Sequence, residues 1–331
     1  KFDDRGFLKS FVDTEAGREL AGEGYPLNTL LMAEDVPAAW DNWDIDADLE
    51  MKFRDSARFV SSKVVSKGAV ELRIRNRYQL SEKSSLTQDV IFYAWSPLVK
   101  FETMMDWQEE HRFLKAAFDT SVFSDFVRQE IQFGYLKRPT TRNTSVEQAK
   151  FEVLNHKYTD LSETRYGVAI LNDCKYGCSI DENSMALTLL KSSTHPAPDA
   201  DQCLHTFTYS LMPHMGDWRK GNTVSQAYSL NMPMTAHVSG GKGEQELTTY
   251  STDTPGVIIE SVKQQLDGQN TIVRMYECYG ARVQTRLTIP AAKHVYLTNL
   301  MEQADHELPI ENGQVVLDFK PYEIVTVMVE E

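Results

Sequence analysis

Apolar and polar residues alternate with a period of two along much of this chain, and this alternation limits its fold more than any other feature. Residues 70–75 and 99–107 both show it, and the apolar segment 90–93 lies between them after a polar turn at 81–85. Because successive side chains of a strand point to opposite faces, such segments predict strands with one buried and one exposed face. Three of them in close succession predict an antiparallel meander.

The same pattern returns near the end of the chain, in residues 272–276, 283–289 and 295–297. Asn312-Gly313 predicts a tight hairpin turn, because both residues tolerate a positive φ angle and strand-forming residues flank them. We therefore expect an all-β protein.

Helical periodicity is scarce. The segment 110–118 would place Phe113, Leu114, Ala117 and Phe118 on one side, which predicts a helical turn or two. Strands and helices do not alternate along the sequence, and this argues against a Rossmann fold or a β/α barrel.

A polar, glycine-rich run at residues 239–244 marks the clearest boundary, since it has little to pack into a core. We expect a large β domain over residues 1–240, a linker over 241–256 and a small β-sandwich domain over 257–331. A single continuous sandwich with a long surface loop is the alternative.

Composition limits the partners and the cellular location that we expect for this chain. Of 331 residues, 34 are Lys or Arg and 48 are Asp or Glu, for a net charge of −14, which argues against a nucleic-acid or membrane-surface partner. Four cysteines are too few for a disulfide scaffold, so we expect a reducing, cytoplasmic location. The chain begins with Lys1 in what reads as a strand, and we expect it to be a piece of something larger.

Signals for catalysis are thin. The eight histidines form no His-x-Asp, His-x-His or His-Glu-x-x-His pattern, and the spacings of His195, His205 and His214 match no zinc site. Cys174 and Cys178 have no second cysteine pair to complete a site, so we expect buried free thiols. Gly-x-Ser-x-Gly and phosphate-loop patterns are absent. We expect no catalytic residue and no metal ligand in this chain.

Two segments are unusual. In residues 34–46, Trp40 and Trp43 are each followed by Asp, which suits a platform that stacks on a sugar while carboxylates accept its hydroxyl hydrogen bonds. The alternative, which we favour from sequence, is that both tryptophans pack the loop into the core while the aspartates cap turns.

The second segment is residues 167–177, where an apolar strand ends in Asn172-Asp173. Binding groups often project from a sheet at such a position. A plain turn closed by Asx hydrogen bonding is equally consistent.

Together with their neighbours, these segments resemble the C-terminal β region of glycoside hydrolase family 38, the retaining α-mannosidases, and its bacterial and cytosolic branch in particular. The resemblance covers essentially the whole chain. It is carried by residues 13–19, 34–46, 105–115, 133–140, 160–163, 172–177 and 320–326.

The resemblance implies an antiparallel supersandwich like that of galactose mutarotase, followed by a small C-terminal β-sandwich. It implies that zinc, the nucleophile and the acid/base carboxylate belong to an N-terminal catalytic domain of the same polypeptide, so that the present chain alone is inactive. Its role would be to buttress that domain and wall the pocket for an α-mannoside, with no cofactor of its own. A homo-oligomer is a further expectation.

Site residues follow from the resemblance only at the rim of the sugar pocket. We expect Asp173, Lys175 and Tyr176 to contact or support the sugar, with Trp43 and Asp44 as further candidates. Lys191 precedes a loop that could also reach the pocket, but distant members place Arg in that region, and we assign Lys191 no ligand role.

Three other functions stay open. The chain could be an independent carbohydrate-binding module, since its aromatic residues allow stacking platforms. It could be a purely structural or oligomer-forming sandwich. It could be a mutarotase-like enzyme, for which His111 and His156 are the histidines we would nominate.

Overall fold

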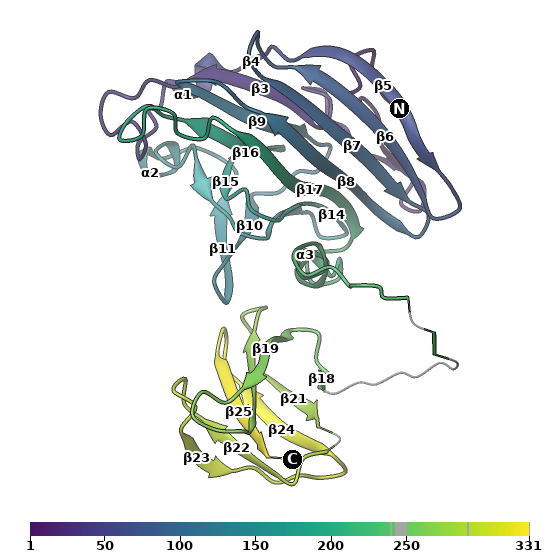
Figure 1. Cartoon of the computed structure of the whole chain (residues 1–331), viewed down its shortest axis with the longest axis vertical. Helices are drawn as coiled ribbons and strands as arrows, with labels where there is room; N and C mark the ends of the chain where they lie inside the picture. Colours follow the sequence, from purple (N-terminus) through teal and green to yellow (C-terminus); the bar gives the residue numbers. More distant parts are fainter. Residues whose placement is uncertain (239, 242–249, 290, 331) are drawn as a thin grey trace. The chain divides into compact units, whose positions relative to one another are not determined.

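The computed structural model describes residues 1–238, 240–241, 250–289 and 291–330. The chain divides into two compact units (Figure 1), one formed by residues 1–130 and 136–234 and the other by residues 131–135 and 235–331. The expected boundary near residue 240 and the expected linker at 241–256 fall partly outside the described residues, and both stay predictions.

Two antiparallel sheets build the first unit. In the described residues the larger has nine strands, in the order β11 (Gly134–Pro139), β10 (Phe126–Ile131), β13 (Tyr158–Ser162), β14 (Tyr166–Asn172), β17 (Leu204–Met215), β8 (Ser96–Asp106), β7 (Ser85–Tyr93), β6 (Glu71–Gln79) and β5 (Arg58–Lys67). The smaller has six, in the order β12 (Val153–Leu154), β15 (Gly177–Asp181), β16 (Ser184–Ser192), β9 (Arg112–Asp119), β3 (Thr29–Glu34) and β4 (Arg54–Asp55). A short pair, β1 (Val12–Asp13) and β2 (Arg18–Glu19), precedes them.

The core of this unit lies between the two sheets. Phe101 and Tyr209 of the larger sheet belong to one buried cluster with Leu114 and Met185 of the smaller sheet. The all-β supersandwich expected from the sequence is confirmed, and so is the meander, because β6, β7 and β8 pair in sequence order.

The helix expected at residues 110–118 is wrong, because this segment forms β9 in the middle of the six-stranded sheet. Leu114, Ala116 and Phe118 face the core, whereas Phe113 on the other face packs against Leu49. A strand buried on both faces is apolar at most positions, so the period of two is lost and the remaining pattern resembles a helical stripe.

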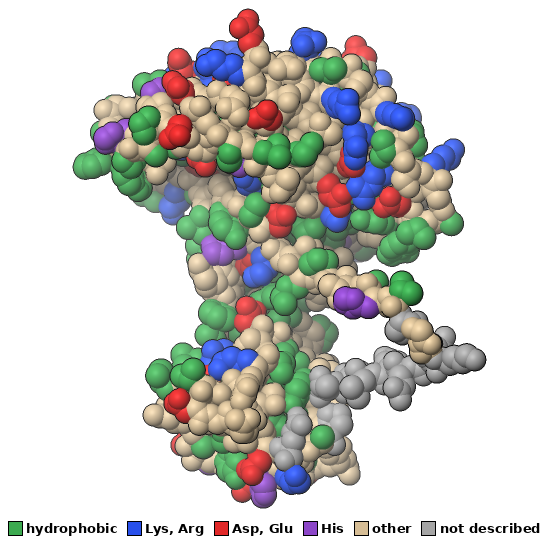
Figure 2. All heavy atoms as spheres, in the orientation of Figure 1, with side chains coloured by type: hydrophobic (Ala, Val, Ile, Leu, Met, Phe, Trp, Pro, Cys, Tyr) green, Lys and Arg blue, Asp and Glu red, His purple; other side chains and the backbone are tan. Residues whose placement is uncertain are grey.

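Charged side chains gather on the outer face of β6, β7 and β8 (Figure 2). Asp89 and Glu102 lie opposite each other on neighbouring strands, an arrangement that is unfavourable for like charges. Arg73 bridges the two carboxylates, and Arg75 makes two further hydrogen bonds to Asp89, of 2.7 and 2.8 Å. These ion pairs offset the repulsion and explain why an exposed sheet face tolerates this row.

Helices are few and short: α1 (Leu49–Lys52), α2 (Ser145–Gln148) and α3 (Thr223–Asn231). A capping box closes the start of α2, with the Thr144 side chain accepting from the Glu147 backbone. None of the helices in the described part of the chain is long and apolar enough to cross a membrane.

The second unit has two sheets in its described residues. One contains β18 (Ser251–Thr252), β21 (Val283–Thr288) and β24 (Gln314–Phe319), and the other contains β19 (Val257–Gln264), β20 (Thr271–Glu277), β25 (Ile324–Glu330), β22 (His294–Thr298) and β23 (Ala304–Glu307). Asn312 and Gly313 have φ angles of 52° and 73°, and Glu311 and Gln314 exchange backbone hydrogen bonds around them. The two-residue hairpin turn is therefore confirmed.

Candidate functional site

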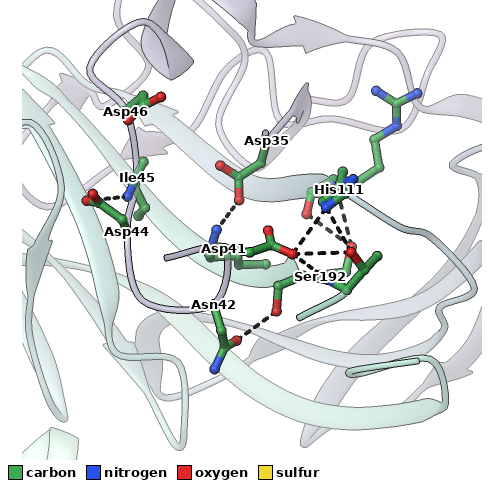
Figure 3. Close-up of polar contacts among 12 residues, drawn as sticks. Asp35, Asp41, Asn42, Asp44, Ile45, Asp46, His111 and Ser192 are labelled. Carbon is green, nitrogen blue, oxygen red and sulfur yellow. Dashed lines mark hydrogen bonds and ion pairs between the residues drawn. The ribbon is translucent and has the colours of Figure 1, made fainter. Parts of the chain in front are cut away.

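The loop that follows β3 is fixed at its base by a buried ion pair. Asp35 is 2% exposed, and the ammonium of Lys191, on β16, donates to its carboxylate (Figure 3). The two residues come together because β3 and β16 flank β9 in the smaller sheet. Burial raises the pKa of Asp35, and the hydrogen bond and charge of Lys191 only partly offset this effect.

Asp41 provides the second attachment, in the middle of the loop. Its Oδ2 accepts hydrogen bonds from the backbone N–H groups of Thr194 and His195, at 2.8 and 3.0 Å, and lies 3.2 Å from Nε2 of His111 (Figure 3). Burial alone would raise the pKa of Asp41, but these bonds outweigh it and the pKa is lowered. The other oxygen, Oδ1, is buried and has no hydrogen-bond partner among the described residues.

Further polar contacts fix the path of the loop between these attachments. The Asn42 side chain accepts from Ser193 Oγ at 2.8 Å, and Asp46 accepts from the backbone of Ala38 at 2.9 Å. Asp44 accepts from the backbone N–H of the next residue, Ile45, at 2.9 Å (Figure 3). The aspartates therefore close turns, as the packing interpretation expected.

The tryptophans do not plug the loop into the core, and that part of the expectation is wrong. Trp40 is 73% exposed and Trp43 is 67% exposed. The polar attachments hold the loop without burying either indole. Trp40 also has a φ angle of 57°, which is uncommon for a bulky residue and is stabilised by hydrogen bonds from the Trp43 and Asp44 backbones to its carbonyl. A pre-ordered loop therefore presents two aromatic faces to solvent.

The turn after β14 is built around Asn172, which is fully buried. Its Oδ1 accepts from the Lys175 backbone at 2.8 Å, and its Nδ2 donates to the His156 carbonyl at 2.6 Å. Asp173 continues the sheet, because its backbone donates to the Thr208 carbonyl and its Oδ2 accepts from the Thr208 backbone. The Asx-type turn expected here is present, and it is compatible with a binding role.

The side chains of Lys175 and Tyr176 each contact an aromatic ring, but they differ in exposure. The Lys175 ammonium lies 4.4 Å from the centroid of the Phe207 ring, and burial lowers its pKa. Tyr176 is 50% exposed and stacks on His156, with ring centroids 4.9 Å apart.

The five expected site residues thus form two groups, Trp43 with Asp44 and Asp173 with Lys175 and Tyr176. Among the described residues, no hydrogen bond or ion pair joins one group to the other. The segment 193–203 connects the residues that Asp41 binds, Thr194 and His195, to β17, whose Thr208 backbone donates to Asp173.

Sequence reasoning missed the residues that hold the Trp loop, by which we mean residues 35–46. Asp35 and Lys191 are 156 residues apart, and only the strand order brings them together. Asp41 was part of the segment that the sequence singled out, but its role as an anchor to residues 194 and 195 has no local signal.

The cysteines differ from the expectation in one respect. Cys178 and Cys278 are buried free thiols, whereas Cys174 and Cys203 are exposed, so the expectation for Cys174 is wrong. Within the described ranges, no cluster of three or more His, Cys, Asp or Glu side chains could hold a metal ion. The described residues therefore do not fit a zinc site.

The fold matches that of a solved structure over the whole chain. The structure superposes on that of an alpha-mannosidase from Enterococcus faecalis V583 with a TM-score of 0.81 at 17% sequence identity, covering 100% of this chain and 41% of that one. Residues 1–199 match the model of the glycosyl hydrolases family 38 C-terminal domain, and residues 256–327 match that of the glycosyl hydrolases family 38 C-terminal beta sandwich domain. The chain belongs to glycosyl hydrolase family 38, and the resemblance noted in its sequence is confirmed.

Curated relatives agree over nearly the whole chain. Alpha-mannosidase 2C1 of Homo sapiens is 35% identical, with 99% of this chain and 32% of the relative aligned. The alpha-mannosidase of Saccharomyces cerevisiae is 29% identical, with 96% of this chain and 32% of the relative aligned. The chain spans about a third of the length of these relatives.

Proposed function

We propose that this chain is the C-terminal β portion of a zinc-dependent, retaining α-mannosidase, in which it buttresses the catalytic domain and forms part of the wall of the mannoside pocket. One observation carries the proposal: the Trp loop is anchored by a buried ion pair and by Asp41, yet leaves Trp40 and Trp43 exposed. Large apolar side chains held in solvent by a rigid support mark an interaction site.

The chemistry of this loop suits a pyranoside. Indole faces stack on the C–H faces of a sugar ring, while carboxylates accept hydrogen bonds from its hydroxyl groups. Asp44 is exposed beside Trp43, so its carboxylate can accept hydrogen bonds from a ring stacked on that indole. Trp43 and Asp44 are therefore the residues we assign to the sugar on this side.

The turn after β14 supplies the second group. Asp173 and Lys175 are fixed by backbone hydrogen bonds, and Tyr176 offers a half-exposed ring. We assign these three residues to hydroxyl contacts or to the support of residues that make them.

The catalytic parts belong, in this proposal, to an N-terminal domain of the same polypeptide. Family 38 relatives three times as long as this chain support that arrangement. Zinc and the double-displacement mechanism would reside there, and the present chain alone would not hydrolyse mannosides. Two exposed free thiols, Cys174 and Cys203, favour a reducing, cytoplasmic location. Self-association is compatible with the exposed apolar residues, but it is not needed for this role.

Hydrolysis of an aryl α-mannoside tests the proposal. The present chain should give no turnover, and the full-length product of its reading frame should be active. In that product, Trp43→Ala should raise KM or lower kcat/KM about tenfold, whereas Trp95→Ala, which removes an equally exposed indole (68%) from the β7–β8 connection, should change neither. Turnover by the present chain, or equal effects of the two variants, would contradict the proposal.

An independent carbohydrate-binding module is the second candidate, and the same exposed tryptophans favour it. It requires that the isolated chain bind mannose oligosaccharides through the Trp loop. Calorimetry separates the two: heat of binding that is lost in Trp40→Ala favours the module, and no heat at millimolar sugar removes it.

A further inference from the structure

The outer face of the six-stranded sheet contains a hollow of about 360 Å³, within the range of small-molecule sites. Its floor follows from the strand register. Ala117 lies opposite Ala186, and Ala186 lies opposite Ser179, so three short side chains meet on neighbouring strands β9, β16 and β15. The next row is Asp119, Ser184 and Asp181. Short side chains in the middle of a sheet leave space above them.

Two segments outside the sheet form the walls of this hollow. Leu49 and Phe53 come from α1 and the residue after it, and Phe151 follows α2. Arg142 joins the two walls, because its Nη1 donates to Glu50 at 2.6 Å. Tyr25 closes a further side and is 43% exposed. The walls therefore contain three aromatic rings.

A buried lysine lies at one end of the floor. The Lys115 side chain is 3% exposed; its ammonium is paired with Glu152 and donates to Ser179 Oγ at 2.6 Å. It also lies 5.5 Å from the centroid of the Phe53 ring. Burying an ion pair contributes little net stability, because desolvation offsets most of the attraction. The pair and Ser179 therefore give the hollow a fixed polar end.

The remaining polar groups accept hydrogen bonds. Asp181 is exposed, and its carboxylate has no hydrogen bond or ion pair among the described residues. Asp119 accepts from Ser184 Oγ and from the Tyr25 backbone, and it keeps further lone pairs. Aromatic walls, carboxylate acceptors and hydroxyl groups around a small apolar floor are the features that bind a polyhydroxylated ring.

We propose that this hollow binds a neutral carbohydrate, a mono- or disaccharide, at a site other than the Trp loop. The sugar's C–H face lies on Phe53, Phe151 or Tyr25, and its hydroxyl groups donate to Asp181 and Asp119. Lys115 and Glu152 fix the polar end of the site. Binding here needs no turnover, so the inference does not depend on the mannosidase proposal.

NMR titration of the present chain tests the site, with methyl α-mannoside and α-mannobiose as probes and backbone amide shifts as the readout. The expected result is saturable shifts at Ala117, Ser179 and Ala186. Asp181→Asn should weaken binding about tenfold, because a hydrogen bond to a charged carboxylate is stronger than one to a neutral amide oxygen. Ala186→Leu should abolish binding by filling the hollow.

Two controls keep the outcome interpretable. Asp125→Asn removes an exposed carboxylate that does not line the hollow and should bind as the parent does. The double variant Trp40→Ala/Trp43→Ala should leave the shifts at Ala186 intact, even if it abolishes any role of the Trp loop. No saturable shifts with either sugar, or unchanged affinity in both Asp181→Asn and Ala186→Leu, would overturn the inference. Shifts that disappear with the tryptophans would assign binding to the Trp loop instead.

Discussion

His214 on β17 reaches across a neighbouring strand to Asp160 on β13, with its Nε2 2.8 Å from Asp160 Oδ2. Gly167 on β14 lies opposite both His214 and Ser162, and a Cβ at that position would be 2.4 Å from His214 Cε1. Asp160 is fully buried and also accepts from Thr223 Oγ1, at the start of α3, at 2.9 Å. One carboxylate thus links two strands and a helix because the residue between the strands has no side chain.

This arrangement predicts a pH-dependent stability. Burial lowers the pKa of His214, but the hydrogen bond and charge of Asp160, assisted by Asp217, outweigh it and raise the pKa above its ordinary value near 6.5. The folded state therefore binds the proton more tightly than the unfolded state. The resulting stability is fully present below about pH 6.5 and is lost as pH rises through the folded-state pKa.

Urea unfolding at a series of pH values between about 5 and 9 measures this effect. The difference in unfolding free energy between the parent and His214→Gln should shrink as pH rises. His195→Gln, at an exposed histidine, should follow the parent at every pH. A difference that is constant across the range would show that His214 does not change charge there.

Gly167→Ala should destabilise the first unit by about 1–3 kcal/mol, the usual cost of overpacking. The new methyl group would meet His214 and Ser162 Oγ, both fixed by Asp160. Gly68→Ala is the matched control, because a Cβ there has only the Val70 backbone nitrogen nearby, at 4.0 Å. Thermal or urea unfolding checks both, and equal stabilities would contradict the packing argument.

Lys191→Met and Asp35→Asn should each destabilise the protein by roughly 3–5 kcal/mol, because each substitution leaves the other member of the ion pair without its charged partner. The double variant should lose less than the sum of the two, and a double-mutant cycle gives the coupling. Both single variants should also change the fluorescence of the Trp loop. Lys52→Met, which breaks an exposed pair with Asp48 at 2.8 Å, should cost less than about 1 kcal/mol.

Thiol labelling of the native protein with a chromogenic disulfide should modify Cys203 first. Cys174 is also exposed, but desolvation and the neighbouring Asp173 raise its pKa to about 11, so little thiolate is present at neutral pH. Burial raises the pKa of Cys178 to about 12, and this thiol should react only after unfolding. Cys203→Ser should remove the fast phase, and a fast phase that persists would contradict this order.

The sequence predicted those parts of the fold in which one face of a strand is exposed to solvent. β6 and β8 alternate because one face packs on the core, and Asn312-Gly313 encodes its turn locally. The prediction for β9 was wrong because Leu49 and Phe53 cover the second face of this strand, and a strand buried on both faces does not alternate. Leu49 and Phe53 precede β9 by some 60 residues, so the sequence of β9 itself does not reveal that they cover it.

The candidate site was predictable in its residue types but not in its geometry. Two tryptophans beside aspartates suggested either a platform or a plug, and only burial separates the two. Exposure of Trp40 depends on the ion pair of Asp35 with Lys191 and on the contacts of Asp41. These contacts join distant strands, so no spacing rule reveals them.

Asp41 binds position 195 through the peptide N–H alone, so this attachment is indifferent to the side chain displayed there. Residue 195 could therefore be exchanged freely, within the limits of its backbone, while the loop keeps its place. Family members could therefore vary the side chain at this position while the Trp loop keeps its attachment. A new recognition group could be engineered there without changing Asp41.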